Sequence, residues 1–513
     1  MSLKLVTAAQ MREIDRVTIQ ERGVSGLDLM ERAGEAVAEE ISLRYHARCV
    51  GIVAGKGNNA GDGLVVARRL AGKGIRTLLM LLSPPDGLSE AARINLERLP
   101  SSVEILDRRS VAAMDTVFAD CDVIVDAILG TGITGPVKGA LGEAIALMND
   151  LGKPIVAVDI PSGLDADTGQ AEGACVCADR TVTMGLPKLG MVRGDGPRLC
   201  GEITVADIGF PEDLTQSADL RTHLLEFLDA ADALPARPLD AHKGFFGSVL
   251  VIAGGRGMSG AAYLTTATAL RSGCGMVYAA FPARVVEALE SHLIEAVKIP
   301  LPEGGGGHLT HESWETLEAA LQKVDAVALG PGIGTHHDTV RLVDEIVCQD
   351  LPMIIDADGL NCLAGKAQYL TRRGAPTILT PHPGEMARLT GLPVAEIQKN
   401  RIEVAQQLAA DARVVVVLKG AKTVVADPGG RVYVNPTGNS GMAKGGSGDV
   451  LTGLIGGLLA QGCSALNAAC AGVYLHGMAG DCARDVLGER GMTAQDILGW
   501  IPRVLKRCDT RNV

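Results

Sequence analysis

Carboxylates follow two of the buried strands expected in the first half of the chain. Asp126 lies near the end of the run DVIVDAIL, and Asp159 near the end of PIVAVDI. Open α/β sheets bind ligands at the carboxyl ends of their strands, so both side chains are expected at such a site. Asn59 and Ser162 would complete an oxygen-rich pocket, which suits a hard monovalent cation and leaves one carboxylate for acid–base work. Each aspartate alone has the simpler explanation of a loop or helix cap.

Three glycine-containing loops stand where expected strands end, the first after the run CVGIVAG and the other two after the strands just named. They are GKGNNAGDG (55–63), DAILGTGITGP (126–136) and VDIPSGLDADTG (158–169). Glycine allows backbone N–H groups to close on an anion at the start of the following helix. The first loop therefore predicts an anion site, although a tight turn with asparagine in the left-handed conformation would give the same pattern.

The strongest motif of the second half is NPTGNSGMAKGGSGDVLTGLIGGLLAQG, residues 435–462. Its glycines precede a helix whose N-terminal amides could neutralise a phosphoryl group. Asp449 falls in the first helical turn, where it could act as the base on a hydroxyl, although aspartate is also favoured there for structural reasons. Upstream, KGAKT (419–423) offers a lysine and backbone amides to a nucleotide phosphate, and Lys444 either does likewise or is solvated.

Three further loops also follow expected strands and contain glycine or proline. They are AGGRGMSGAA (253–262), GPGIG (330–334) and TPHPGE (380–385). His382 stands between two prolines and is held rigidly, which is compatible with either a functional or a neutral structural role. His476 lies on an apolar helical stretch and is interpreted as a satisfied core histidine.

Short apolar runs alternate with helical stretches along the whole chain, which predicts the α/β class with parallel strands covered on both faces. The polar, Ala/Pro-rich stretch 211–240 is the expected boundary between two domains, residues 1–215 and 230–513. The four-glycine run 304–307 is expected to be a flexible surface loop.

Composition excludes several classes of protein. The 513 residues include 64 glycines and carry a net charge of −12, which argues against binding to nucleic acid or anionic membranes. Charge appears too early for an N-terminal signal peptide, and no apolar run reaches the ~18 residues of a membrane span. Twelve cysteines without a CxxC pair indicate reduced thiols. We therefore expect a cytoplasmic protein.

The first-half loops, together with TAAQMREID and LDLMERAG, resemble the NAD(P)H-hydrate epimerase family over about residues 1–210. The resemblance implies a Rossmann-like three-layer domain that interconverts the R and S hydrates of NADH and NADPH. It implies that Asp159 contacts the reacting ring and that Asn59, Asp126 and Ser162 bind potassium. The other substrate-binding residues it implies are Asn58, Asn59, Ala60, Gly61, Asp62, Gly130, Thr131, Gly132, Ile133, Thr134, Gly135 and Pro136. The family usually has glycine at the position of Ala60, where alanine at positive φ would cost about 1 kcal/mol.

The second half contains HKGFFGSVLVIAGG, GPGIG, DADGLN, LTPHPGEMARL, VLKGAKT and GMAKGGSGDVLTG, and it resembles the ADP-dependent NAD(P)H-hydrate dehydratase family. That family has a ribokinase-like fold. The resemblance implies two sets of binding residues. For the hydrated dinucleotide these are Ala261, Gly332, His382 and Asp449. For the adenine nucleotide they are Lys419, Gly420, Ala421, Lys422, Thr423 and Gly448.

Both halves in this order resemble a bifunctional enzyme of NAD(P)H-hydrate repair. We expect K⁺, Mg²⁺ and ADP as a co-substrate, hydrated NADH and NADPH as substrates, Asp159 and Asp449 as catalytic residues, and a homo-oligomer. The alternative is a ribokinase-type small-molecule kinase in the second half and a non-catalytic nucleotide-binding module in the first.

Overall fold

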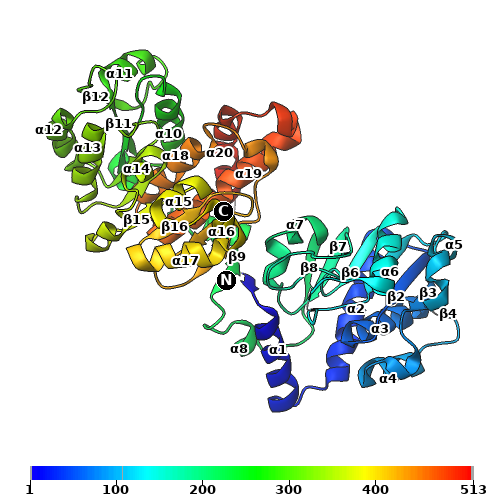
Figure 1. Cartoon of the computed structure of the whole chain (residues 1–513). Coiled ribbons are helices and arrows are strands. Elements are labelled where there is room, and N and C mark those ends of the chain that lie inside the picture. The colour runs from blue at the N-terminus through cyan, green and yellow to red at the C-terminus, as the bar shows by residue number, and fades with distance from the viewer. Residues whose placement is uncertain (1–2, 107, 134, 510–513) are drawn as a thin grey trace. The chain divides into compact units, whose positions relative to one another are not determined.

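The computed structural model describes residues 3–106, 108–133 and 135–509. They form two compact units, one consisting of Lys4–Leu220 and one consisting of Leu3 together with the chain from Arg221 onward. Figure 1 colours the first unit from blue to green and the second from green to red. Both units are of the α/β class expected from the sequence.

The first unit is built on a seven-stranded sheet in the order β4-β3-β2-β5-β6-β7-β8. Each strand of this sheet is parallel to its neighbours. The strands are β2 (Cys49–Ala54), β3 (Arg76–Leu81), β4 (Glu104–Leu106), β5 (Val123–Ala127), β6 (Ile155–Val158), β7 (Arg180–Met184) and β8 (Glu202–Ala206), while β1 (Leu3–Leu5) opens the chain.

Helices cover both faces of this sheet. On β2, the alternate residues Val50 and Ile52 pack into one apolar cluster, while Cys49 and Val53 pack into another. The first cluster includes α2 and α3, and the second α5 and α6. The helices of the unit are α1 (Ala8–Arg16), α2 (Gly26–Tyr45), α3 (Asn58–Gly72), α4 (Glu90–Glu97), α5 (Met114–Val117), α6 (Gly139–Asp150), α7 (Gly196–Leu199) and α8 (Glu212–Thr215). The two-sided burial explains why these strands read as continuous apolar runs.

The sheet of the second unit is mixed. From β9 it runs in the order β9-β18-β17-β16-β15-β14-β13-β10-β11-β12, and β17 is antiparallel to both of its neighbours. The strands are β9 (Thr222–Leu224), β10 (Ser248–Ile252), β11 (Met276–Pro282), β12 (Val297–Leu301), β13 (Ala326–Leu329), β14 (Met353–Ile355), β15 (Thr377–Leu379), β16 (Val415–Leu418), β17 (Val424–Ala426) and β18 (Val432–Val434).

Helices α10, α18, α19 and α20 share one large apolar core with this sheet. Residues on the opposite side of the strands, such as Leu250 and Ile355, are also fully buried. The helices are α9 (Phe227–Asp232), α10 (Ser259–Arg271), α11 (Ala283–Leu289), α12 (Trp314–Leu321), α13 (His337–Val347), α14 (Ala357–Cys362), α15 (Pro383–Thr390), α16 (Val394–Lys399), α17 (Arg401–Ala412), α18 (Ser447–Ala460), α19 (Ala465–Gly491) and α20 (Ala494–Asp509).

Parallel pairing brings the chemically interesting loops to common edges. In the first unit they follow β2, β5 and β6, which are neighbours in the sheet. In the second unit most of them follow β10, β13, β14, β15 and β16, again neighbours, whereas the segment 435–462 follows β18. The strands expected at DVIVDAIL and PIVAVDI are confirmed as β5 and β6, and α3 begins at Asn58, inside the first glycine loop.

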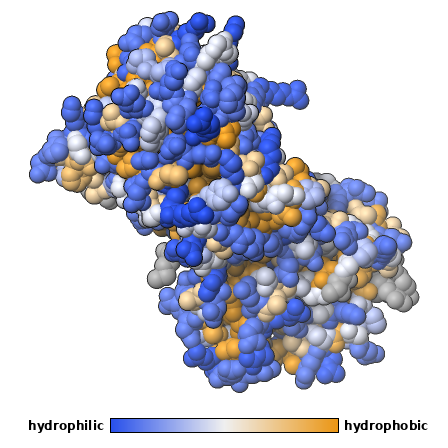
Figure 2. Space-filling model, turned by 60° about the vertical axis from the view of Figure 1, so that its left-hand side comes forward, coloured by the Kyte–Doolittle hydropathy of each residue, from blue (hydrophilic) through white to orange (hydrophobic). Residues whose placement is uncertain are grey.

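No helix in the described part of the chain is long and apolar enough to cross a membrane. On the face shown in Figure 2, most of the surface is hydrophilic, and apolar residues are scattered among polar ones.

Candidate active sites

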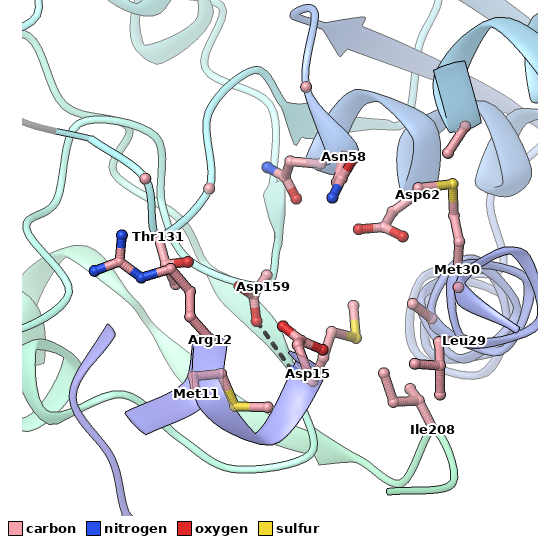
Figure 3. Close-up of a pocket in the computed structure, with 18 of the residues that line it drawn as sticks. Met11, Arg12, Asp15, Leu29, Met30, Asn58, Asp62, Thr131, Asp159 and Ile208 are labelled. Carbon is pink, nitrogen blue, oxygen red and sulfur yellow. Dashed lines mark hydrogen bonds between the residues drawn. The ribbon is translucent and has the colours of Figure 1, made fainter. Parts of the chain in front are cut away.

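A cavity of about 580 Å³ lies at the carboxyl edge of the first sheet. This size is within the range of small-molecule sites. Its walls come from α1, α2, the start of α3 and the loops after β5 and β6. In Figure 3 the carboxylates of Asp15, Asp62 and Asp159 point into the same space, with Asn58 above them. The cavity is therefore acidic at its centre.

Asp159 is held in one orientation by a buried lysine. Lys188, whose side chain is 1% exposed, forms an ion pair with Oδ1 of Asp159. The same oxygen accepts hydrogen bonds from the Met184 amide at 3.1 Å and the Thr183 hydroxyl at 3.3 Å. Asp159 has φ = 66°, a left-handed conformation that non-glycine residues rarely adopt and that is concentrated at functional sites. The chain thus fixes this carboxylate at the cavity wall.

Two further carboxyl groups in the cavity hold protons more tightly than free aspartate. Burial, and next the charge of Asp159, raises the pKa of Asp15 to about 6 against the opposing effect of Lys188. Burial, followed by the charges of Asp159 and Asp15, raises the pKa of Asp62 well above its ordinary value. One ion-paired carboxylate thus faces two carboxyl groups that can carry protons, a combination typical of acid–base sites.

Asp126 and Ser162 lie together just behind the cavity wall. The Ser162 hydroxyl donates to Oδ1 of Asp126 at 2.6 Å, and the Ser162 amide donates to Oδ2 at 2.7 Å. Burial raises the pKa of Asp126 to about 6, although its hydrogen bonds with Ser162 and Ile128 act in the opposite direction. No basic side chain of the described residues pairs with this carboxylate, so it is a buried anion without a counter-ion.

Asn59 connects this buried group to the cavity, which it lines. Its Nδ2 donates to the Leu129 carbonyl at 2.8 Å, and the Leu129 amide donates to the Ser162 hydroxyl at 2.8 Å. The Asn59 Oδ1 is buried and has no hydrogen-bond partner among the described residues. An unpaired buried oxygen is costly, and a bound cation would satisfy it. The donor set therefore fits the monovalent cation expected from the sequence.

Most of the expected substrate residues of the first unit do line the cavity: Asn58, Asn59, Asp62, Gly130, Thr131, Gly132, Ile133 and Asp159. Ala60, Gly61, Gly135 and Pro136 are not among its lining residues, and Thr134 lies outside the described residues. Ala60 is buried in the first turn of α3 and does not have positive φ, so alanine carries no conformational cost there.

The glycines of the first loop mainly serve close packing. A Cβ on Gly55 would lie 2.0 Å from the Ile128 carbonyl oxygen, one on Gly61 2.5 Å from the Met30 sulfur, and one on Gly63 2.5 Å from the Ala127 Cβ. A Cβ on Gly57, the N-cap of α3, would meet nothing within 4 Å. Of the four glycines, Gly57 alone borders open space at the helix start.

Sequence reasoning missed Asp15, Lys188 and Arg12 as cavity residues. Asp15 and Arg12 stand on α1 within TAAQMREID, whose family resemblance was the available signal. Thr7 and Gln10 cap this helix reciprocally and so fix where it begins. Lys188 carries no local signal, because nothing in its neighbours marks it as buried.

The second unit places a charged cluster at the carboxyl ends of β14, β15 and β16. Lys419 forms an ion pair with Oδ1 of Asp356, a residue that is 1% exposed, and its Nζ lies 3.8 Å from Glu385. The Thr452 hydroxyl on α18 donates to Oδ2 of Asp356 at 2.6 Å. Burial acts to lower the pKa of Lys419, but Asp356 and Glu385 outweigh it and raise the pKa. The ammonium thus stays charged near the start of α18.

Asp449 is in the first turn of α18, next to this cluster. Burial, and next the charge of Asp356, raises its pKa to about 6 despite the nearby Lys419. The helix has no side-chain N-cap, because Gly446 occupies that position with φ = 93°. A Cβ on Gly448 would lie 3.4 Å from the Lys419 Nζ, so the glycine keeps this ammonium next to the helix start. The site combines free amides, an ammonium and a carboxylate.

The other expected dinucleotide residues lie on loops that converge on this region. A Cβ on Gly332 would be 3.2 Å from the Ala261 Cβ, so these two positions adjoin. The Gly334 amide donates to Asp358 at 2.9 Å, and the Asp358 charge contributes to the raised pKa of Asp449. His382 caps α15 by accepting from the Gly384 amide at 2.9 Å, while its ring is about half exposed.

In the loop 419–423, which is expected to bind the adenine nucleotide, the Lys422 side chain already has a hydrogen-bond partner within the protein. The ammonium of Lys422 donates to the Pro436 carbonyl at 2.8 Å, and Lys422 has φ = 54°. Arg401 donates to the carbonyls of Leu418 and Lys419 at 2.9 and 3.2 Å, which holds the loop from behind. Loop amides and Lys419 therefore remain as the groups available to a phosphate.

Two basic residues considered from the sequence have other roles. Lys444 donates to the carbonyl oxygens of Arg490 and Met492 at 2.7 and 2.5 Å, near the end of α19, so its ammonium is neither free nor simply solvated. His476 is buried as expected, but its Nε2 has no hydrogen-bond partner among the described residues, so it is not fully satisfied. Burial lowers its pKa to about 4, and the ring is neutral.

Asp356 is the main residue of the second site that sequence reasoning did not name. It directly follows a buried strand, as Asp159 does, so the same reasoning could have found it. Ala357, next to it, has φ = 48°, a second strained position at a strand end.

Comparison with protein families assigns both halves of the chain. Residues 26–190 match the family model described as YjeF-related protein N-terminus, and residues 249–503 match the model described as NAD(P)H-hydrate dehydratase.

Curated relatives match along almost the whole chain. The bifunctional NAD(P)H-hydrate repair enzyme Nnr of Moorella thermoacetica is 42% identical, over 98% of this chain and 97% of its own. The enzyme of the same name from Escherichia coli K12 is 35% identical, over 97% of this chain and 93% of its own. A solved structure, the ADP/ATP-dependent NAD(P)H-hydrate dehydratase of Bacillus subtilis co-crystallised with ATP/Mg²⁺, is 36% identical with a TM-score of 0.49, over 56% of this chain and 98% of that one.

Proposed function

The chain belongs to the family of bifunctional NAD(P)H-hydrate repair enzymes, and on that premise we propose how its two sites divide the work. Its two activities are NAD(P)H-hydrate epimerase and ADP/ATP-dependent NAD(P)H-hydrate dehydratase. The first unit interconverts the R and S hydrates in the cavity around Asp159. The second unit dehydrates the S hydrate at Asp449, converting ADP to AMP and phosphate. The matching of both halves to relatives over nearly the full chain carries this conclusion.

In the first site, the reacting carbon is C6 of the hydrated nicotinamide ring, which carries the added hydroxyl. Whether the ring opens or water leaves and returns, inversion needs one group that accepts a proton and another that donates one. We assign the accepting role to Asp159, which Lys188 holds in place. The donor is one of the two carboxyl groups with raised pKa, Asp15 or Asp62. Asn58 and the amides of residues 130–132 would hold the dinucleotide phosphates.

K⁺ fits the group formed by Asn59, Asp126 and Ser162. When bound, it would neutralise the buried carboxylate and fix the loop that follows β5 against Asn59. The unpartnered Oδ1 of Asn59 supports this assignment among the residues that the structure describes.

Removing K⁺ is expected to slow epimerisation at least about tenfold, because Asp126 would again lack a counter-ion and the loop 128–132 would lose a support. The conversion of stereochemically pure R hydrate to S hydrate is measured by chromatography that separates the two epimers, in K⁺ buffer and in tetramethylammonium buffer. Asn59→Ala should abolish most of the difference between the buffers, while Glu143→Gln, at an exposed position of α6, should retain it. Equal rates for the native chain in both buffers would contradict the assignment.

In the second site, the β-phosphoryl group of ADP is transferred to the C6 hydroxyl. Asp449 takes the hydroxyl proton. Phosphate then leaves C6 and a proton leaves C5 to solvent, which restores the C5–C6 double bond of the nicotinamide ring. Lys419 and the first amides of α18 offset the charge on the phosphoryl oxygens. The loop 419–423 and Gly448 hold the adenine nucleotide.

Mg²⁺ fits a site in which carboxylates outnumber cations: Asp356, Glu385 and Asp449 interact with one Lys419. Proteins hold Mg²⁺ with one or two carboxylates together with substrate phosphates. Glu385 would supply such a carboxylate, which leaves Asp449 free to act as the base, and the ion would reduce the negative charge of the nucleotide phosphates.

The alternative is a small-molecule kinase in the second unit and a non-catalytic nucleotide-binding module in the first, and the two alternatives differ in their products. The test is stoichiometric: AMP, phosphate and NADH should form in equal amounts from ADP and S hydrate. A stable phosphorylated product in place of NADH would contradict the dehydratase mechanism.

A further inference from the structure

Three histidines and an aspartate gather in the second unit, apart from the residues assigned above. His308 follows the glycine run 304–307, and His336, His337 and Asp338 mark the start of α13. One nitrogen from each of His308 and His336 and one oxygen of Asp338 all lie within 4.8 Å of one another. Neither proposed reaction uses any of these side chains.

The distances are close to those of a metal site. The Nε2 of His308 and the Nδ1 of His336 lie 3.9 and 3.7 Å from Oδ2 of Asp338. Ligands of a tetrahedral Zn²⁺ ion are separated by roughly 3.3 Å, given bonds of about 2.0–2.1 Å. The observed separations are too long for good hydrogen bonds. These two separations would each have to shorten by about half an ångström, and the two nitrogens would have to approach each other, for all three atoms to coordinate one ion.

The imidazole rings are also placed against one another. The rings of His308 and His336 are stacked, with centroids 3.7 Å apart and planes at 28°. The Nδ1 of His336 accepts a long 3.4 Å bond from the Asp338 amide, which is too weak to fix the ring firmly. To bind one ion, both rings must turn out of this stack so that their nitrogen lone pairs converge.

The glycine run is folded around His308. A Cβ on Gly304 would lie 2.4 Å from the His308 ring, and one on Gly306 would lie 3.2 Å from it. The Gly304 amide donates to the His308 carbonyl at 2.9 Å, and the Gly307 amide donates to the Gly304 carbonyl at 2.8 Å. The sequence predicted a flexible surface loop here. The structure shows a turn whose glycines make room for one imidazole.

We propose that His308, His336 and Asp338 bind one divalent transition-metal ion, with Zn²⁺ the ion that best matches two imidazoles and a carboxylate. Water or His337, whose Nε2 lies 3.1 Å from Asp338 Oδ1, completes the coordination. The ion joins the loop 304–308 to the start of α13. The Arg256 amide donates to the Gly307 carbonyl at 3.1 Å, so the loop before α10 is tied to the same point. The ion thus supports the loop that leads into α10, where Ala261 lies, and the segment between Gly332 and α13.

The test is metal binding to the full chain, produced without a histidine tag and stripped with a chelator. Competition between the protein and a chromogenic zinc indicator is expected to show one Zn²⁺ per chain. His308→Ala and Asp338→Asn should each weaken binding at least about tenfold. His292→Ala, which removes an exposed histidine outside the cluster, should bind as the native chain does. Equal affinity of His308→Ala and the native chain would overturn the proposal.

Co²⁺ in place of Zn²⁺ identifies the ligand type. Visible d–d bands without a near-ultraviolet thiolate band are expected; a thiolate band would place the ion on cysteine and overturn the assignment. Zn²⁺ should raise the melting temperature of the native chain but not that of His308→Ala. Equal melting temperatures of the two metal-free proteins would show that the variant is folded, so its loss of binding would be specific.

Discussion

Asp449→Asn is expected to lower ADP-dependent recovery of NADH from its S hydrate by about 10²–10⁴-fold, the usual effect of removing a general base. Asparagine keeps the size of the side chain at the start of α18 but cannot take the hydroxyl proton. Stopped-flow or steady-state NADH absorbance measures the rate. Epimerisation in the same preparation should be unchanged, since Asp449 belongs to the other unit.

The pH profile of the native dehydratase tests the same assignment. A base must be unprotonated, and burial with the Asp356 charge raises the pKa of Asp449 to about 6. The rate should therefore fall as pH decreases through about 6 and level off above it. Asp358→Asn serves as the comparison: it removes a neighbouring negative charge and should move the inflection to lower pH, even where it lowers the rate. A near-native rate for Asp449→Asn, or a profile without this inflection, would refute the role of Asp449.

Asp159→Asn is expected to reduce epimerisation by about 10²–10⁴-fold while the S hydrate is still dehydrated at the native rate. The substitution also leaves the Lys188 ammonium buried without its counter-ion. Breaking a buried ion pair in this way typically costs about 3–5 kcal/mol, so the melting temperature of the first unit should fall as well. Chiral chromatography of R hydrate measures the reaction, and calorimetry measures the stability.

A double variant separates the chemical role from the structural one. Asp159→Asn combined with Lys188→Met removes both charges, so it should recover part of the lost stability but none of the epimerisation. Asp86→Asn, at an exposed position of the same unit, should change neither property. Epimerisation that returned together with stability would show that Asp159 acts only on folding.

Much of the fold follows from local sequence pattern. The apolar runs that form β2, β5, β6, β10 and β16 are continuous because both sheet faces are covered, and such runs are recognisable without tertiary information. Asp126 near the end of β5 and Asp159 directly after β6 can be named from the sequence as well, because each is the charged residue that interrupts such an apolar run. Strands β7 and β8 are not recognisable in this way, because mixed runs such as RTVTM and EITVA lack that apolar continuity.

The partners of the site residues could not be predicted in the same way. Lys188 lies 29 positions after Asp159, and only the path of β7 and the following loop returns it to that carboxylate. Asp15 reaches the cavity from α1. The roles of the glycines in the loop 55–63 could not be told apart from the sequence either, because Gly55 and Gly63 permit close packing while Gly57 borders open space. Sequence can identify a strand-end residue, but tertiary structure decides what faces it.

The central claim is that one chain repairs both hydrates with two separate sites. The direct test incubates the purified chain with a mixture of R and S hydrates, with and without ADP, and measures both epimers and NADH over time. Without ADP, the epimers should equilibrate and no NADH should form. With ADP, the whole mixture should become NADH, whereas Asp159→Asn should convert the S fraction at the native rate and leave most of the R fraction. Recovery by the native chain that stopped at the S fraction, or NADH formation without a nucleotide, would contradict the account.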